Sequence, residues 1–157
     1  MVAESQKSVI YSDLCFGCGM KNPIGLKLKF RWDGKAVRTE YTPDKLHQGW
    51  ADIIHGGIIA AVLDEAIAYA AGYEGIKCVT AAMQVRFKHP LTVGEPTTVT
   101  ASVTKNLQRY VETEAKITLA DGTLIADCTA KQFVVSETPI TKIGEELKKN
   151  GKIPGPD

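Results

Sequence analysis

The chain has 157 residues, of which 44% are hydrophobic and 24% are charged. A chain of this size buries about 70% of the surface that its unfolded form exposes, so we expect an ordered single domain over residues 1–157 rather than a disordered chain. Nineteen Lys and Arg residues stand against eighteen Asp and Glu residues, which leaves a net charge of +1. This balance gives no support to a nucleic-acid or membrane-surface partner.

No targeting segment is expected. Residues 1–8 are polar and lack the apolar run of a secretory signal. The longest apolar run, residues 53–71, contains His55, Asp64 and Glu65, and a carboxylate at its centre disfavours membrane insertion by about 2.5–3.5 kcal/mol. Four cysteines do not make a disulfide scaffold in a chain of this length. We therefore expect a reduced, cytoplasmic protein with no membrane partner.

The N-terminal half predicts a loop, two strands and a helix. Residues 1–23 are irregular, with loop signals in the sequence CFGCG and in an Asn-Pro pair. Apolar and polar residues then alternate over 26–33 and again over 37–42, which is typical of two half-buried strands joined by an Asp-Gly turn. Residues 58–71 have almost no polar face, which predicts a helix buried on nearly all sides that ends at Gly72 and Gly75.

The C-terminal half predicts further strands by the same alternation. They cover residues 79–87, 98–103, 111–119 and 123–135, followed by a C-terminal tail from 138 with a short charged helix at 142–150. A single long helix cannot cover both faces of such a sheet. We therefore predict an α+β fold in which a curled antiparallel sheet wraps around one central helix.

Asp64 and Glu65 are consecutive in the middle of the predicted helix. Consecutive helix residues point about 100° apart, so at most one of them faces the core and the other reaches solvent or an interface. A buried carboxylate without a partner is costly. The inward carboxylate is therefore either a chemical group or part of a structural pair at a subunit contact.

The sequence His55-Gly56-Gly57 stands at the start of this helix. Free backbone N–H groups and the positive end of the helix dipole meet there, and glycines allow a ligand atom to approach the backbone closely. Such a site suits an anion or a developing oxyanion. A plain glycine-rich turn is the alternative interpretation.

The His-Gly-Gly sequence followed by an aspartate nine residues after the histidine resembles the hotdog-fold acyl-CoA thioesterases. The likeness is to the branch similar to the phenylacetate-pathway thioesterase, in the 4-hydroxybenzoyl-CoA thioesterase superfamily. The upstream sequences CFGCG and NPIGL also look like a segment common in that branch. The resemblance covers residues 15–136.

The resemblance implies a hotdog fold, dimers or dimers of dimers that join along the strand at 79–87, and active sites across that interface. It implies hydrolysis of acyl-CoA thioesters, with Asp64 as nucleophile or general base and a backbone N–H of the His55 turn, at Gly56, as oxyanion donor. Thr80 falls where the family has a hydroxyl that holds the nucleophile or water. No cofactor is implied beyond the coenzyme A of the substrate.

The resemblance also leaves substrate-binding candidates. Many close relatives have an Asn or Gln about six residues before the histidine, where this chain has Gly49, so Gln48 or His47 is the candidate replacement. Gly57 adds a second glycine to the turn. The phosphates of coenzyme A need basic groups, and Arg86 and Lys88 are the candidates at the end of their strand.

Cys15 and Cys18 form half of a zinc or redox motif. Cys78 and Cys128 lie in predicted strands without the paired spacing of a zinc ribbon. We therefore expect no metal and predict that Cys15 and Cys18 are dispensable for catalysis.

Two other functions stay open on the same fold. A non-catalytic protein that binds acyl or aromatic CoA ligands would need no carboxylate in the helix. A hydratase or dehydratase uses a carboxylate and a histidine, usually placed differently around the helix. The sequence leaves the acyl length and aromatic preference open, because one methylene is worth only about 1–3 kcal/mol in a pocket.

Overall fold

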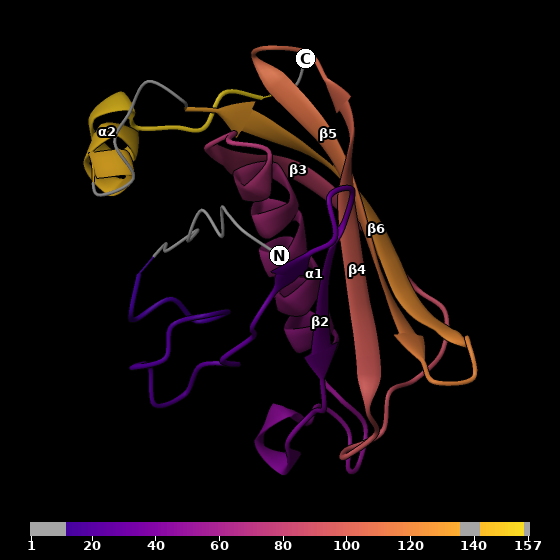
Figure 1. Ribbon diagram of the computed structural model, residues 1–157. Helices are drawn as coiled ribbons and strands as arrows, with labels where there is room; N and C mark the ends of the chain where they lie inside the picture. Colours follow the sequence, from indigo (N-terminus) through magenta and orange to yellow (C-terminus); the bar gives the residue numbers. More distant parts are fainter. Residues whose placement is uncertain (1–11, 136–141, 156–157) are drawn as a thin grey trace, which may run out of the picture.

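The computed structural model describes residues 12–135 and 142–155. Figure 1 shows one long helix lying along a face of a twisted antiparallel sheet. In chain order the elements are β1 (Arg31–Trp32), β2 (Val37–Tyr41), a 3-10 turn (Lys45–His47), α1 (Gly56–Tyr73), β3 (Cys78–Phe87), β4 (Thr97–Asn106), β5 (Tyr110–Leu119), β6 (Leu124–Val134) and α2 (Ile143–Asn150).

The sheet has six strands in the order β1-β2-β4-β5-β6-β3, and every neighbouring pair is antiparallel. The crossover through α1 carries the chain from β2 at one side of the sheet to β3 at the opposite edge. The predicted α+β arrangement of one central helix and an antiparallel sheet is confirmed. It leaves β3 paired with β6 along one edge only, within the described residues.

The helix α1 is buried because its apolar residues surround most of its circumference. Seven of its side chains are buried against the sheet: Ile59, Val62, Leu63, Ala66, Ile67, Ala70 and Ala71. The sequence predicts that Gly72 and Gly75 end the helix, and its last residue is Tyr73, between these two glycines. Glu74 caps it and Gly75, with φ of 80°, turns the chain away, because only the later glycine takes the left-handed conformation.

The predicted strand over residues 26–33 is largely wrong, because only Arg31–Trp32 pairs with β2. Lys27 has φ of 54°, which interrupts the extended backbone. The side chains still alternate, with Leu28 and Phe30 buried. The backbone N–H of Leu28 donates to Gly17 at 2.9 Å, so this segment pairs with the N-terminal loop instead of with a strand.

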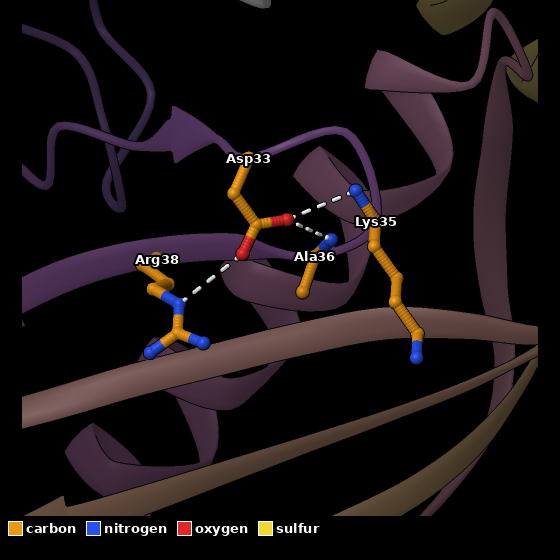
Figure 2. Close-up of polar contacts among 4 residues, drawn as sticks. All are labelled: Asp33, Lys35, Ala36 and Arg38. Atoms are coloured by element: carbon orange, nitrogen blue, oxygen red, sulfur yellow. Dashed lines mark hydrogen bonds and ion pairs between the residues drawn. The ribbon is translucent and has the colours of Figure 1, made fainter.

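The predicted turn between the first two strands is confirmed. Asp33 accepts hydrogen bonds from the N–H groups of Lys35 at 2.9 Å and Ala36 at 2.8 Å, and pairs with Arg38 at 3.4 Å (Figure 2). These N–H groups hold the pKa of the Asp33 carboxyl below its usual range. Gly34 has φ of 94°, which fits the glycine of this turn.

The remaining predicted elements are confirmed with small changes of boundary. The strands β3, β4 and β5 cover the alternating segments at 79–87, 98–103 and 111–119 and extend beyond them, while β6 is one residue shorter at each end than the predicted 123–135. The charged helix α2 ends at Gly151, whose φ of 73° makes it a left-handed cap. Among the described helices, none has the length and apolar character needed to cross a membrane.

Candidate active site

Asp64 is held by a hydroxyl from the edge strand. The Thr80 Oγ1 on β3 donates a hydrogen bond to Asp64 Oδ1 at 2.6 Å, and both side chains are half-buried. No further hydrogen bond of the Asp64 carboxylate is recorded among the described residues, so Oδ2 keeps its lone pairs for another group. A carboxylate fixed at one oxygen and open at the other is suited to attack a carbon or to take a proton.

Glu65 points away from Asp64, as the helix geometry predicts, and is half-buried. It lies beneath the N-terminal loop, where its two carboxylate oxygens are 3.5 and 3.6 Å from Cys15 Sγ. Burial raises the pKa of the Glu65 carboxyl, and the nearby charge of Asp64 adds to this effect while the thiols of Cys15 and Cys18 oppose it. Burial also raises the pKa of the Cys18 thiol.

His55 caps the helix whose first residue is Gly56. Its Nδ1 accepts a hydrogen bond from the Gly57 N–H at 2.8 Å, so a neutral ring carries its proton on Nε2. Gly56 is the first residue of α1, so the helix has no carbonyl four residues earlier to accept its N–H. No hydrogen bond of that N–H is recorded among the described residues. The Gly56 N–H is the free donor of this turn.

A cavity of about 410 Å³ opens at this turn and is lined by Gly49, Trp50, Ile54, His55 and Gly56. The Trp50 side chain is 84% exposed in the single chain. The structure therefore places an open, partly apolar hollow in front of a helix N-terminus, where an oxyanion would be stabilised.

Asp64 and Gly56 are too far apart to act on one atom within a single chain. They are eight residues apart in α1, which corresponds to about 12 Å along the helix axis. Nucleophile and oxyanion donor must both lie about 3 Å from the reacting group. Within one chain, Asp64 and the Gly56 N–H therefore cannot both contact one reacting group.

The strand β3 connects these two groups along its length. Its Thr80 contacts Asp64 in the middle of α1, whereas a Cβ built on Gly56 would lie 3.5 Å from the Phe87 ring at the other end of β3. The strand therefore runs antiparallel to α1, with its first half beside the carboxylate and its end beside the helix N-terminus.

Comparison with known proteins shows which family this part of the chain is similar to. Residues 51–126, which include His55, Gly56, Asp64 and Thr80, match the model of the thioesterase superfamily. The resemblance to the thioesterase superfamily is confirmed. No curated protein sequence matches the chain.

Solved structures of thioesterases share the fold. A thioesterase superfamily protein superposes with a TM-score of 0.74 at 25% identity, over 79% of this chain and 61% of that protein, so the chain spans less than two thirds of its length. The Escherichia coli PaaI protein from the phenylacetic acid degradation operon has a TM-score of 0.66 at 22% identity, over 70% of this chain and 80% of its own. These likenesses confirm the hotdog fold.

A hypothetical thioesterase from Streptococcus pneumoniae, solved with coenzyme A, has a TM-score of 0.66 at 14% identity, over 69% of this chain and 88% of its own. Two of its variants have also been solved, one with an aspartate and one with a threonine replaced by alanine. The two replaced positions are 16 residues apart in that protein.

The candidate replacements for the second oxyanion donor are engaged in their own loop. The Gln48 side chain donates to the Lys45 carbonyl at 2.6 Å and accepts from the N–H of Asp52. His47 Nδ1 lies 2.9 Å from the Tyr41 hydroxyl. Both side chains stabilise the loop before α1. The amide nitrogen and the amide oxygen of Gln48 both bind the loop backbone, so neither is directed toward a ligand.

The two basic candidates for the phosphates of the coenzyme differ. The Arg86 guanidinium pairs with Asp127, with both Nε and Nη2 at 2.6 Å from the same carboxylate oxygen. Lys88 is exposed just beyond the end of β3, where its backbone N–H donates to Ile125. Of the two, only Lys88 has a side chain without a recorded partner in the described part of the chain.

Gln132 is a residue that the sequence reasoning missed. It lies on β6 directly opposite Thr80 and is fully buried. Thr113 donates to its Oε1 at 3.1 Å, while its Nε2 has no partner among the described residues. A glutamine at an inward position of an alternating strand is the signal that could have identified it, because a buried amide needs partners.

Proposed function

We propose that this chain hydrolyses acyl-CoA thioesters to a free acid and coenzyme A. The observation that carries the proposal is the 2.6 Å hydrogen bond from Thr80 to Asp64 in the superfamily-matched region. The 16-residue separation of these two residues equals that of the aspartate and threonine replaced in the Streptococcus pneumoniae thioesterase, which was solved with coenzyme A. This equality supports the assignment of Asp64 and Thr80 to the site.

The site in this proposal is shared between two chains. The edge strand β3 has ten residues, and an unpaired edge of this length invites pairing with another strand. If two copies of β3 pair antiparallel about a two-fold axis near mid-strand, Thr80 of one chain lies opposite Phe87 of the partner subunit. Asp64 then faces Gly56 of the partner subunit, which removes the separation of about 12 Å found within one chain.

In this reaction, Asp64 and the Gly56 N–H of the partner subunit have separate roles. The thioester carbonyl oxygen accepts the N–H of the partner's Gly56, and one such donor is typically worth about 2.7–4 kcal/mol of barrier. Asp64 either takes a proton from water, whose oxygen bonds to the acyl carbon, or attacks that carbon itself and is released by water afterwards. In both cases the carbon–sulfur bond breaks and the thiolate of coenzyme A leaves, so water supplies the new oxygen of the acid.

The two helix carboxylates cannot exchange roles. Glu65 is turned toward Cys15 beneath the N-terminal loop, whereas Asp64 is turned toward the edge strand. Of the substrate-binding candidates, Gly57 donates to the His55 cap, and the exposed Lys88 is the proposed partner of a coenzyme phosphate. The proposal requires no cofactor besides the coenzyme A of the substrate.

A panel of aliphatic and aromatic acyl-CoA thioesters, scored by release of free thiol, tests this function. We expect turnover by the native protein and a loss of about 10²–10⁴-fold in kcat for Asp64→Ala, with substrate binding retained. Glu114→Ala removes an exposed carboxylate on β5 and is the matched control that keeps turnover. If the native protein hydrolyses no member of the panel yet binds one, a non-catalytic binding function replaces the proposal.

A further inference from the structure

Cys15, Cys18 and Glu65 converge beside the central helix, at a place that the proposed hydrolysis does not use. Their ligand atoms all lie within 4.8 Å of one another, and all three residues are half-buried. The cysteines come from the N-terminal loop and the glutamate from the middle of α1. The sequence shows only a pair of cysteines, whereas the fold brings a third ligand from 50 residues further along the chain.

The spacing of these atoms fits a tetrahedral zinc ion. With a Zn–S distance of about 2.3 Å and a Zn–O distance of about 2.0–2.2 Å, tetrahedral ligands place sulfur and oxygen roughly 3.5 Å apart. Cys15 Sγ lies 3.5 and 3.6 Å from the two carboxylate oxygens of Glu65. The Cys-x-x-Cys spacing is also that of one half of many structural zinc sites.

The loop is built to hold these atoms in place. The Gly19 N–H donates to the Cys15 carbonyl at 2.9 Å, which closes a tight turn around the two thiols. A Cβ on Gly17 would come within 2.5 Å of the Glu65 carboxylate, and a Cβ on Gly19 would come within 2.4 Å of the Cys15 backbone. At Gly19 the clash is with backbone, so only glycine fits there, whereas a side chain at Gly17 would displace the Glu65 carboxylate from the two thiols.

The cluster offers negative ligands and no cation of its own. None of the ion pairs recorded among the described residues includes Glu65. Without an ion the thiols keep their protons, and the Cys15 thiol donates hydrogen bonds to the Glu65 carboxylate. Once both thiols are deprotonated, the two thiolates and the carboxylate form a negative ligand set that a divalent cation with affinity for sulfur can neutralise. A disulfide between the cysteines would instead leave Glu65 without a role.

We propose that Cys15, Cys18 and Glu65 bind one thiophilic divalent cation, for which Zn²⁺ is the best match, with water in the fourth position. Binding releases the thiol protons to solvent. The ion fastens the N-terminal loop to α1 at Glu65, which points about 100° around the helix from Asp64 and its Thr80 contact. This site is independent of the proposed hydrolysis.

Metal titration of the full chain tests the site. The protein is stripped with a chelator under a non-thiol reductant and titrated with Zn²⁺ against a chromophoric competitor. A parallel titration uses Co²⁺, because thiolate ligation gives a charge-transfer band and tetrahedral geometry gives intense visible absorption. We expect the native protein to bind one equivalent of Zn²⁺. With Co²⁺ it should show both the charge-transfer band and the intense visible absorption.

Variants then assign the ligands. Since loss of an outer-shell partner alone weakens metal binding about 10–100-fold, we expect Glu65→Gln and Cys15→Ser to weaken Zn²⁺ binding at least about tenfold. Circular dichroism checks that each variant is folded. Cys78→Ser, at a half-buried cysteine of β3, is the matched control and keeps the native affinity. Absence of a stoichiometric Zn²⁺ site, or one that survives both ligand substitutions, overturns the proposal.

Discussion

The Thr80 hydroxyl orients the Asp64 carboxylate through the 2.6 Å hydrogen bond that it donates. Because it positions a group and does not itself react, we expect Thr80→Ala to lower kcat by about 10–100-fold. Thr80→Ser keeps the hydroxyl and should retain most of the turnover. Steady-state kinetics on the best acyl-CoA checks this, and equal losses in the two variants would show that the hydroxyl is not what matters.

Gly56→Pro removes the proposed oxyanion donor with little disturbance of the helix. Proline is favoured at the first position of a helix, and His55, at φ −60° and ψ 132°, already has the conformation required before proline. We expect kcat to fall by about 10²–10³-fold, with the thermal midpoint unchanged or higher. Gly56→Ala keeps the N–H and is the control. Normal turnover by a folded Gly56→Pro protein would exclude this donor.

Cys78 shows how burial and a neighbouring charge suppress thiol chemistry. Burial raises the pKa of its thiol to about 12, and the negative charge of Asp64 adds to the shift. Only about one thiol in ten thousand is then ionised at pH 8, against roughly a quarter for an unperturbed cysteine. We expect slow alkylation that accelerates about tenfold per pH unit above pH 8. Mass spectrometry measures it, and rapid modification of the folded protein at pH 8 would contradict the shift.

Residue roles were only partly predictable from the sequence. The divergence of Asp64 and Glu65 followed from helix geometry, but the position of Glu65 did not, because the loop that covers it comes from 50 residues earlier in the chain. Gln48 was a candidate donor by sequence position alone. Its amide instead binds the backbone of its own loop, a local contact that no periodicity reveals.

At the scale of elements, hydrophobic periodicity predicted α1 and the strands β2 to β6. It failed for residues 26–30, where Leu28 and Phe30 are buried in alternation although the backbone does not join the sheet. Burial alone produces the pattern, while strand pairing also requires an extended backbone, which Lys27 interrupts. Gly72 alone did not mark the helix end, because it stays helical and only Gly75 takes the left-handed conformation.

The unpaired edge of β3 predicts that two chains form a dimer along this strand. Gln84 is exposed near the middle of this strand, so in a symmetric antiparallel pair it lies close to its own copy. Gln84→Lys places like charges together across the axis, which costs about 0.2–1 kcal/mol per pair. Sedimentation velocity should show a native dimer and a shift toward monomer in this variant.

The matched control is Thr129→Lys. Thr129 is the partner of Gln84 on β6, one strand inside the edge, so the same charge there leaves the dimer intact. A native protein that sediments as a monomer at micromolar concentration would contradict the assembly, and the shared site with it.

For the whole molecule, the family resemblance predicted more of the fold than composition and hydrophobic alternation did. Composition and alternation led to a sheet around one helix, but the hotdog fold came from His55, Gly56, Gly57 and Asp64 taken together with the upstream loop. Within one chain, the proposed carboxylate and the proposed oxyanion donor are separated by about 12 Å of helix. The proposed hydrolysis therefore requires two paired chains.

Complementation between two inactive variants tests whether each active site is shared between two chains. Asp64→Ala and Gly56→Pro chains carrying different tags are produced together, and the mixed dimer is purified. If each site joins Asp64 of one chain to Gly56 of the partner subunit, one of the two sites in the mixed dimer is intact. We then expect about half of the native turnover per dimer, although each variant alone is nearly inactive. A mixed dimer no more active than the two variants would contradict the shared site.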